Sequence, residues 1–199
     1  MLSVLFVCTG NICRSPIAEG LLAHRSARLL GGTLRVGSAG TWARPGQPPM
    51  PETVRAAGER GVDISSLRAS SLDPEIVGEA DVVLTMTAEH RDEVARIAPE
   101  ASSKTFTLKE LVTLLRRLPP APYPPSRDAA LARIVAADEL RRSADAPAVP
   151  DEDVADPLGM SVETYRAVAW ELDGLVDALV GGLFGDLRRA SAAAGGTGA

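Results

Sequence analysis

The stretch VLFVCTGNICRSPIAEGLL, residues 4–22, decides the fold that we expect for this chain. Its first residues form an apolar run of the kind that makes a buried strand, and this run ends at Cys8. A short loop follows. Ser15 and Pro16 then indicate the start of a helix, with Ser15 as the N-cap and Pro16 at the first helical position. The stretch therefore predicts a strand, a tight loop and a helix in immediate succession.

The alternation of strand and helix continues along the chain. Three further apolar runs predict strands, at residues 33–40, 81–86 and 104–108. Helical periodicity predicts helices at residues 16–30, 52–61, 88–98, 109–118 and 162–184. Strands and helices that alternate at this spacing predict an α/β fold in which helices cover both faces of a parallel sheet. The active site of such a sheet lies beyond the carboxyl ends of its strands, where we expect Cys8 and Ser38.

One segment interrupts this pattern. Residues 119–125 are rich in proline and exclude both helix and inner strand, whereas residues 126–144 have the periodicity of a helix. We interpret residues 117–150 as a Pro-rich and helical insertion that lies on a single domain of residues 1–187. The last residues, 188–199, have the composition of a disordered tail.

The composition limits the classes of partner. The chain has 199 residues, of which 45% are hydrophobic, and this suits one globular domain. Its net charge of -5 and the lack of a basic block argue against nucleic acid as a partner. No apolar run is long enough to cross a membrane and the N-terminus lacks the pattern of a signal peptide, so we expect no membrane insertion and a cytoplasmic location. The two cysteines form no disulfide framework, and no spacing of cysteine or histidine is typical of a metal site.

The loop that follows the first strand has the features of an anion site. It runs from Cys8 to Arg14 through Thr9, Gly10, Asn11, Ile12 and Cys13. Backbone N–H groups of such a loop, together with the N-terminus of the next helix, supply positive partial charge. Glycine and asparagine permit the backbone angles that a tight loop needs, and the arginine guanidinium offers parallel donors to phosphate oxygens. We expect this loop to hold a phosphoryl group.

Cys8 lies at the base of the predicted site. The loop N–H groups, the helix N-terminus and Arg14 all favour the thiolate, which is the nucleophilic form of cysteine. A thiolate beneath a phosphoryl group is placed for in-line attack on phosphorus. The alternative is a buried cysteine that only ends the strand, and the Gly-Asn turn and Ser-Pro helix start make it the weaker interpretation. The loop lacks the Gly-Lys-Ser/Thr of a nucleotide-binding loop.

A departing oxygen needs a proton, and the candidate acids are Asp156 and the acidic run at 151–153. The run at 151–153 is most simply a solvated loop. Asp156 precedes Pro157, which stiffens the turn and fixes the direction of the carboxyl group. We therefore expect Asp156 to be the general acid, although Asp-Pro is also an ordinary turn.

These motifs together resemble those of the low-molecular-weight protein tyrosine phosphatases of bacterial type. The resemblance rests on VLFVCTGNICRSP at residues 4–16 and continues through SAGT at 38–41, ADVVLTMTAEHR at 80–91, TFTLKELV at 105–112 and DVADPLG at 153–159. It implies a three-layer fold with a four-stranded parallel sheet, and an enzyme that uses neither metal nor cofactor. The implied substrate is a phosphorylated protein and the product is inorganic phosphate. We expect a monomer or a weak dimer.

The resemblance also implies a role for each residue of the reaction. Cys8 forms a phosphocysteine intermediate. Arg14 binds phosphate and stabilises the transition state. Asp156 protonates the leaving group and then acts as a base on the water that hydrolyses the intermediate.

Five other residues belong to the expected phosphate- and substrate-binding site. The resemblance implies that Asn11 and Ser38 hold the loop in shape and that Ser15 donates to the thiolate. Cys13 matches a cysteine found in many relatives, and it is either a disulfide partner for the nucleophile under oxidation or a buried small residue. Trp42 is either a wall that stacks on a flat substrate group or a cover for the hydrophobic core, and its loop position favours the wall.

The chain departs from the family pattern at two places. Leu158 stands where relatives usually carry Tyr or Phe, which removes one aromatic flank. Leu67, Arg68, Ala69 and Ser70 stand where many relatives have a His-x-Ala-Arg stretch. If that histidine supports the loop in relatives, another group has to support it here.

Three alternatives concern the substrate and the reaction. Bacterial relatives that act on phosphoarginine carry threonine where this chain has Ile12, so Ile12 favours phosphotyrosine and a protein-arginine phosphatase is the alternative. Thioredoxin-linked arsenate reductases need further cysteines downstream, and this chain has none after Cys13. A non-catalytic phosphoprotein-binding module would lack the nucleophile or the acid, and both residues are present here.

Overall fold

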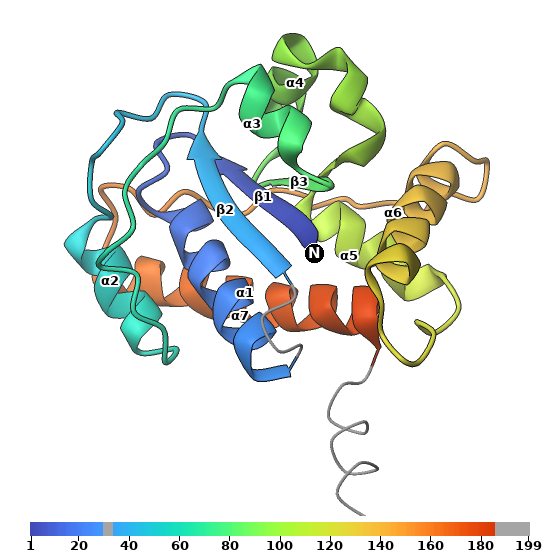
Figure 1. Cartoon of the computed structure of the whole chain (residues 1–199). Coiled ribbons are helices and arrows are strands. Elements are labelled where there is room, and N and C mark those ends of the chain that lie inside the picture. Colours follow the sequence, from blue (N-terminus) through green and yellow to red (C-terminus); the bar gives the residue numbers. More distant parts are fainter. Residues whose placement is uncertain (30–33, 186–199) are drawn as a thin grey trace, which may run out of the picture.

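Four parallel strands form the sheet at the centre of this computed structural model, which describes residues 1–29 and 34–185 (Figure 1). The tail predicted at 188–199 lies outside the described residues. None of the helices in the described ranges is long and apolar enough to cross a membrane.

The sheet places the end of the first strand at its centre. The strands are β1 (Leu2–Cys8), β2 (Leu34–Gly40), β3 (Val82–Thr85) and β4 (Thr105–Thr107), in the order β2-β1-β3-β4. All the pairings are parallel, and β1 pairs with a strand on each side. Cys8 is in register with Gly40 of β2, and Val7 is in register with Thr85 of β3. This confirms the predicted four-stranded parallel sheet.

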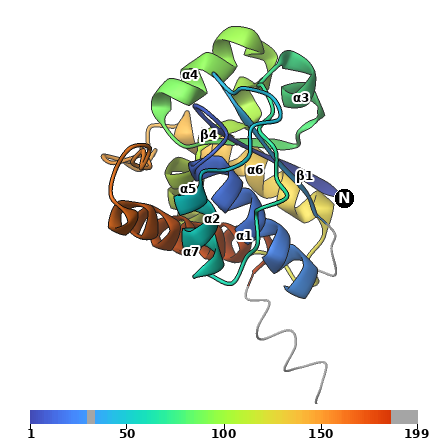
Figure 2. The ribbon, with the colours of Figure 1, turned by 90° about the vertical axis from the view of Figure 1, so that its left-hand side faces the viewer.

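The alternation of side chains along β1 explains the two layers of helices. Leu2, Val4, Phe6 and Cys8 belong to one core cluster, whereas Leu5 and Val7 belong to the other. The first face is covered by α1 (Arg14–Leu29), α2 (Pro51–Gly58), α5 (Leu108–Arg117) and α7 (Val162–Phe184), and the second by α3 (Pro74–Glu79), α4 (Ala88–Ile97) and the 3-10 helix η1 (Pro99–Lys104). Figures 1 and 2 show the sheet between these two layers.

The segment predicted as an insertion contains one helix, α6 (Arg127–Arg141), as the periodicity indicated. Ser126 caps its N-terminus by accepting a hydrogen bond from the backbone N–H of Ala129. The buried Arg133 guanidinium holds α6 against its neighbours, because it donates to the carbonyl groups of Pro119 at 2.7 Å and of Gly182 in α7. These acceptors lie near the C-terminal ends of α5 and α7, where the helix dipole favours a cation.

Two details of the expected elements are wrong. Helix α1 begins at Arg14, so Ser15 lies inside the first turn and is not the N-cap. The Ser15 hydroxyl is bonded to the side chains of Cys8 and Asn11 and is not used as a cap. The short helices α3 and η1, of six residues each, were not expected.

Candidate active site

Asn11 holds the loop between β1 and α1 in shape. Its backbone has φ of 54°, a left-handed conformation that asparagine tolerates better than most residues. Its Nδ2 donates to Ser15 Oγ at 2.9 Å and to Ser38 Oγ at 2.7 Å, and its Oδ1 accepts from the backbone N–H of Ser70 at 2.8 Å. The Ser70 amide therefore supports the loop in the segment where the chain lacks the His-x-Ala-Arg stretch. The loop is tied to α1, to β2 and to this segment by one side chain.

A close approach of two backbones fixes the other side of the loop. A Cβ on Gly40 would lie 2.5 Å from the Thr9 carbonyl oxygen and 2.9 Å from the Asn11 nitrogen, so only glycine fits there. The backbone N–H groups of Thr41 and Trp42 donate to the carbonyl groups of Cys8 and Thr9, at 3.0 and 2.9 Å. This ladder places Trp42 at the edge of the loop.

The Cys8 sulfur lies beneath the loop beside a hydroxyl donor. Cys8 is 2% exposed, and its Sγ is 3.0 Å from Ser15 Oγ. Because Ser15 Oγ accepts a hydrogen bond from Asn11 Nδ2, its own hydrogen is available for a hydrogen bond to the sulfur. A hydrogen bond donated to sulfur favours the thiolate over the thiol. The structure thus places Ser15 where the resemblance implied.

Glu19 supports this arrangement from behind, and the sequence did not single it out. Ser38 Oγ donates to Glu19 Oε2, which leaves the Ser38 oxygen to accept from Asn11. Burial raises the pKa of Glu19, and the hydrogen bond from Ser38 opposes that rise. A glutamate on a helix is ordinarily a solvated residue, so nothing in the sequence marked it.

Arg14 joins the loop to a segment far along the chain. Its guanidinium is buried, and Nη2 donates to Asp156 Oδ2 at 2.7 Å, across 142 residues, and to Thr9 Oγ1 at 3.2 Å. Nη1 donates to the carbonyl oxygen of Val154 at 3.1 Å. Arg14 Nε is buried and has no hydrogen-bond partner among the described residues, so this donor is available to a bound anion.

The loop that carries Asp156 is fixed at the carboxyl end of β3. The Val154 N–H donates to the Met86 carbonyl at 2.7 Å, directly beyond β3. Asp153 Oδ1 accepts from the Ala88 N–H at 2.8 Å, at the N-terminus of α4. Glu152 is paired with Arg91 at 2.7 Å. The expectation of a solvated run at 151–153 holds for Asp151 and Asp153, which are exposed, whereas Glu152 is half-buried and paired with Arg91.

The Asp156 carboxylate reaches the cavity that the loop surrounds. Its Oδ2 is paired with Arg14, its Oδ1 accepts from the Leu158 N–H at 3.1 Å, and its side chain is 43% exposed. The side chain is thus held in direction at the mouth while remaining open to a ligand. These two hydrogen bonds orient the side chain, and the contribution of Pro157 to its direction stays a prediction.

The cavity has a volume of about 290 Å³ and contains most of the predicted residues. Its lining comprises Cys8, Thr9, Gly10, Ile12, Cys13, Arg14, Trp42, Arg44, Gln47, Asp156 and Leu158. The loop residue Asn11 and its partners Ser15 and Ser38 do not line the cavity. Trp42 is 83% exposed, so it is no part of the core. Arg44 and Gln47 were not expected, and only their place after SAGT points to them.

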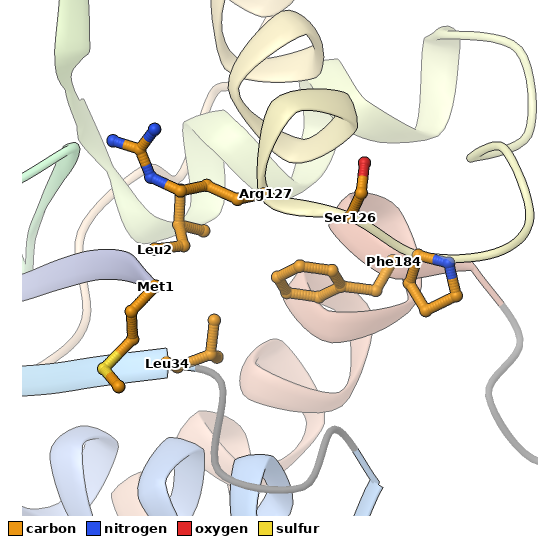
Figure 3. Close-up of a pocket in the computed structure, with 7 residues that line it drawn as sticks. Met1, Leu2, Leu34, Ser126, Arg127 and Phe184 are labelled. Atoms are coloured by element: carbon orange, nitrogen blue, oxygen red, sulfur yellow. The ribbon is translucent and has the colours of Figure 1, made fainter.

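Two other hollows have different surroundings. The outer hollow, of about 430 Å³, adjoins the cavity through Thr9 and Trp42, and its remaining lining residues are Thr41, Glu89, His90, Asp92, Glu93 and Arg96. The third hollow, of about 210 Å³, lies at the amino-terminal ends of β1 and β2, beside Leu2, Leu34 and Phe184 (Figure 3). Cys8 is at the opposite end of β1, so the third hollow is remote from the reacting residues. In the described residues no group of three or more His, Cys, Asp or Glu side chains is arranged to hold a metal ion.

Cys13 lines the cavity as a thiol. Burial raises its pKa to about 11, and the negative charges of Cys8 and Asp156 add to the rise. Both cysteines are free. Cys13 is therefore protonated at neutral pH, and the nucleophile is assigned to Cys8 on geometry.

His90 is a buried residue of the site that the sequence placed only on a helix. Its ring nitrogens lie 2.7 Å from Thr87 Oγ1 and 2.9 Å from Thr9 Oγ1. Burial lowers the pKa of His90 from 6.5 to about 4; Arg14 contributes to the fall, while Asp156 and Asp153 oppose it. His90 is therefore neutral at neutral pH. One of its ring nitrogens donates a hydrogen bond and the other accepts one.

This neutral histidine predicts how stability depends on pH. His90 binds a proton less readily in the folded protein than in the unfolded chain. Its contribution to the free energy of unfolding is therefore present above pH 6.5 and is lost as the pH falls toward about 4. The free energy of unfolding, measured by urea denaturation across this range, should fall with decreasing pH. His90→Phe should show a smaller slope, and an equal slope in both proteins would contradict the assignment.

Comparison with known proteins identifies the family. The family described as low molecular weight phosphotyrosine protein phosphatase matches residues 3–139. The protein-arginine-phosphatase of Geobacillus stearothermophilus is 34% identical over 88% of this chain and 92% of its own length. The low molecular weight protein-tyrosine-phosphatase Etp of Escherichia coli K12 is 38% identical over 64% of this chain and 81% of its own length.

Solved structures agree with the fold and extend the match to the Asp156 loop. The low molecular weight protein tyrosine phosphatase from T. tengcongensis is 36% identical with a TM-score of 0.68, covering 90% of this chain and 98% of that chain. The YwlE arginine phosphatase from Geobacillus stearothermophilus is 30% identical with a TM-score of 0.67, covering 100% of this chain and 99% of that chain. The loop, its buried cysteine and arginine, and these matches agree: the chain belongs to the low molecular weight phosphotyrosine protein phosphatase family.

Proposed function

We propose that this protein removes the phosphoryl group from phosphotyrosine in other proteins, through a phosphocysteine intermediate at Cys8. One observation carries the proposal: Cys8, Arg14 and Asp156 line a single cavity, although Arg14 and Asp156 are 142 residues apart in the chain. A nucleophile, a phosphate-binding cation and an acid are the groups that such a hydrolysis needs.

In the first step the Cys8 thiolate attacks phosphorus from below. The S–P bond forms while the bond from phosphorus to the leaving oxygen breaks, and Asp156 gives that oxygen a proton. Backbone N–H groups of the loop and the Arg14 guanidinium hold the three remaining oxygens. The phosphoryl group competes with the Asp156 side chain for the Arg14 guanidinium, so the carboxyl group is released toward the leaving oxygen.

In the second step water attacks phosphorus and the S–P bond breaks. Asp156, now a carboxylate, takes a proton from the water, and the sulfur leaves as the thiolate that Ser15 stabilises. Inorganic phosphate is released and Cys8 is ready for another cycle. Both proton transfers use the same carboxyl group, which enters the second step in the protonation state that the first leaves behind.

The apolar surroundings of the cavity support an aryl phosphate as substrate. Ile12, Trp42 and Leu158 are apolar side chains in the lining, and Trp42 and Leu158 are 83% and 52% exposed. An exposed indole offers a flat surface to an aromatic ring. Relatives with either substrate in their names match this chain, so overall identity does not choose between them.

The experiment compares phosphotyrosine and phosphoarginine peptides of the same sequence, in the presence of EDTA. Wild type should hydrolyse phosphotyrosine with the higher kcat/KM. A preference for phosphoarginine would overturn the substrate assignment. Failure to hydrolyse either peptide would overturn the proposal that the protein is a phosphatase.

Ile12→Thr should shift this preference toward phosphoarginine, by about tenfold in the ratio of kcat/KM values. Threonine brings a hydroxyl that can bond to a guanidinium or to the attacking water, whereas isoleucine has none. Ile12→Val is the matched control, since it keeps a branched apolar side chain. The assignment of Ile12 to substrate choice is wrong if Ile12→Thr and Ile12→Val change the ratio equally.

We also propose that the protein acts in the cytoplasm as a monomer or weak dimer, on one domain of residues 1–187 with the insertion at 117–150. Free cysteines, one of them at the base of the cavity, support a reducing compartment. The packing of α6 on α5 and α7 through Arg133 supports an insertion within one domain. Sedimentation of the purified protein measures its state of association.

A further inference from the structure

His90 connects the N-terminus of α4 to the phosphate loop through two threonine hydroxyls. Its Nδ1 lies 2.7 Å from Thr87 Oγ1, and its Nε2 lies 2.9 Å from Thr9 Oγ1. The histidine is 5% exposed, so water does not replace these partners freely. Thr9 Oγ1 in turn accepts from Arg14 Nη2 at 3.2 Å. The chain of contacts therefore runs from Thr87 through His90 and Thr9 to the arginine of the site.

The positions of the hydrogens follow from what each group already accepts. Thr87 is the N-cap of α4, and its Oγ1 accepts the backbone N–H of His90 at 3.3 Å, so its own proton is free to be donated. The 2.7 Å separation from Nδ1 suits a hydroxyl donor, since O–H groups approach acceptors more closely than N–H groups. Nδ1 then accepts, and a neutral imidazole carries its single proton on Nε2. His90 Nε2–H therefore donates a hydrogen bond to Thr9 Oγ1.

Thr9 Oγ1 then accepts two hydrogen bonds, one from His90 Nε2 and one from Arg14 Nη2. Its own proton is the one hydrogen that remains for another partner. Thr9 is exposed and lines the catalytic cavity. With the opposite tautomer Thr9 would donate to His90 and present only a lone pair to an anion, which a phosphate site does not favour.

We propose that His90 is a positioning residue that donates from Nε2 to Thr9 and so directs the Thr9 hydroxyl proton toward an oxygen of the bound phosphoryl group. The proposal rests on the proposed function. In this arrangement the Thr9 hydroxyl is a further donor to the phosphoryl group, beside the backbone N–H groups of the loop and Arg14. A bond donated to a charged oxygen in an enclosed site is stronger than one between neutral groups, so its loss weakens both phosphate binding and the transition state.

The tautomer of His90 tests, on the unaltered protein, whether Nε2 donates to Thr9. The chain has two histidines, and the other, His24, is exposed. Nitrogen-15 spectra of the imidazole rings therefore contain two sets of signals, which His24→Gln assigns. We expect the Nε2–H tautomer for His90, and a shift of its Nε2 proton when inorganic phosphate is added. An Nδ1–H tautomer, or signals that phosphate leaves unchanged, overturns the proposal.

Kinetics of variants test whether the Thr9 hydroxyl donates to the bound phosphoryl group. Thr9→Val should lower kcat/KM for an aryl phosphate and weaken inhibition by inorganic phosphate by roughly 10- to 100-fold, and Thr9→Ser should restore most of both. His90→Phe should change both in the same direction, and His90→Gln, whose amide can replace Nε2–H, should recover part of the loss. Because His90 acts through Thr9, the double variant Thr9→Val/His90→Phe should be about as active as Thr9→Val. Losses that multiply would overturn the connection.

Failure of this inference and failure of the proposed function give different results. If wild type does not hydrolyse an aryl phosphate, the proposed function fails, and the response of the His90 signals to phosphate still tests the hydroxyl donor. If wild type is active and Thr9→Val is equally active, only the role of His90 and the Thr9 hydroxyl is overturned.

Discussion

Cys8→Ser should lower kcat for an aryl phosphate by roughly 10⁴-fold or more. The serine hydroxyl is not ionised at neutral pH, and the Ser15 donor beside it serves a thiolate, so the variant has a much weaker nucleophile beneath the loop. The loop and Arg14 are unchanged in this variant, so binding of inorganic phosphate should be retained. Steady-state hydrolysis and a phosphate-binding titration measure the two quantities separately.

Cys13→Ser is the comparison for this result, because it removes the other thiol of the same cavity. Cys13 is held as a thiol, with a pKa raised to about 11 by burial, and should not supply the nucleophile. Its replacement should therefore cost far less activity than the replacement of Cys8. Equal losses in the two variants would sink the assignment of the nucleophile.

Asp156→Asn should lower kcat for a phosphotyrosine peptide by about 10²- to 10⁴-fold, because the leaving oxygen no longer receives a proton. The loss should be smaller for p-nitrophenyl phosphate, whose leaving group departs as a stable anion. Asparagine keeps the shape of the side chain and an acceptor for the Leu158 N–H. Measured over aryl phosphates of increasing leaving-group basicity, kcat/KM, which reports the step in which the leaving group departs, should fall more steeply in the variant than in wild type.

Asp151→Asn provides the matched control for this series. Asp151 is 86% exposed and is paired with Lys109 at 3.2 Å, away from Arg14. Its replacement should leave the dependence on the leaving group unchanged. If Asp156→Asn also leaves that dependence unchanged, Asp156 is not the acid and its pairing with Arg14 is structural.

The parts of the fold that the sequence predicted are those in which local pattern and tertiary packing agree. β1 is buried on both faces and reads as a continuous apolar run, and α7 has long helical periodicity that ends at Phe184, as expected. Helices α3 and η1 have six residues each, too few for a period of 3.6 to repeat. The N-cap assignment failed at Ser15 because its hydroxyl is engaged by Cys8 and Asn11.

The residues of the site also fall into two groups, those that local sequence predicts and those that only tertiary contacts reveal. Cys8 and Arg14 were predictable because one short loop holds both, and Asp156 because an Asp-Pro turn marked it. Glu19 and His90 were not predictable, since each lies on a helix where its residue type is ordinarily solvated. Their partners, Ser38 and Thr9, come from other elements of the fold. Only the packing of strands and helices makes such contacts visible.

The departures at Leu158 and at 67–70 show how the chain compensates for missing family residues. The Ser70 backbone N–H, which needs no particular side chain, bonds to Asn11 at 2.8 Å. Leu158 is 52% exposed at the mouth and leaves Trp42 as the aromatic side chain in the lining. The loop therefore keeps its support, while the contact offered to a substrate ring changes.

The covalent intermediate tests the central claim most directly. Asp156→Asn should form it readily from p-nitrophenyl phosphate, which needs no acid, and should hydrolyse it slowly for lack of a base. Rapid denaturation of this reaction, followed by peptide mass spectrometry, should find one phosphoryl group on the peptide that contains Cys8, released by treatment that cleaves S–P bonds. A turnover-competent protein that carries no phosphoryl group, or carries it on any other residue, would contradict the mechanism.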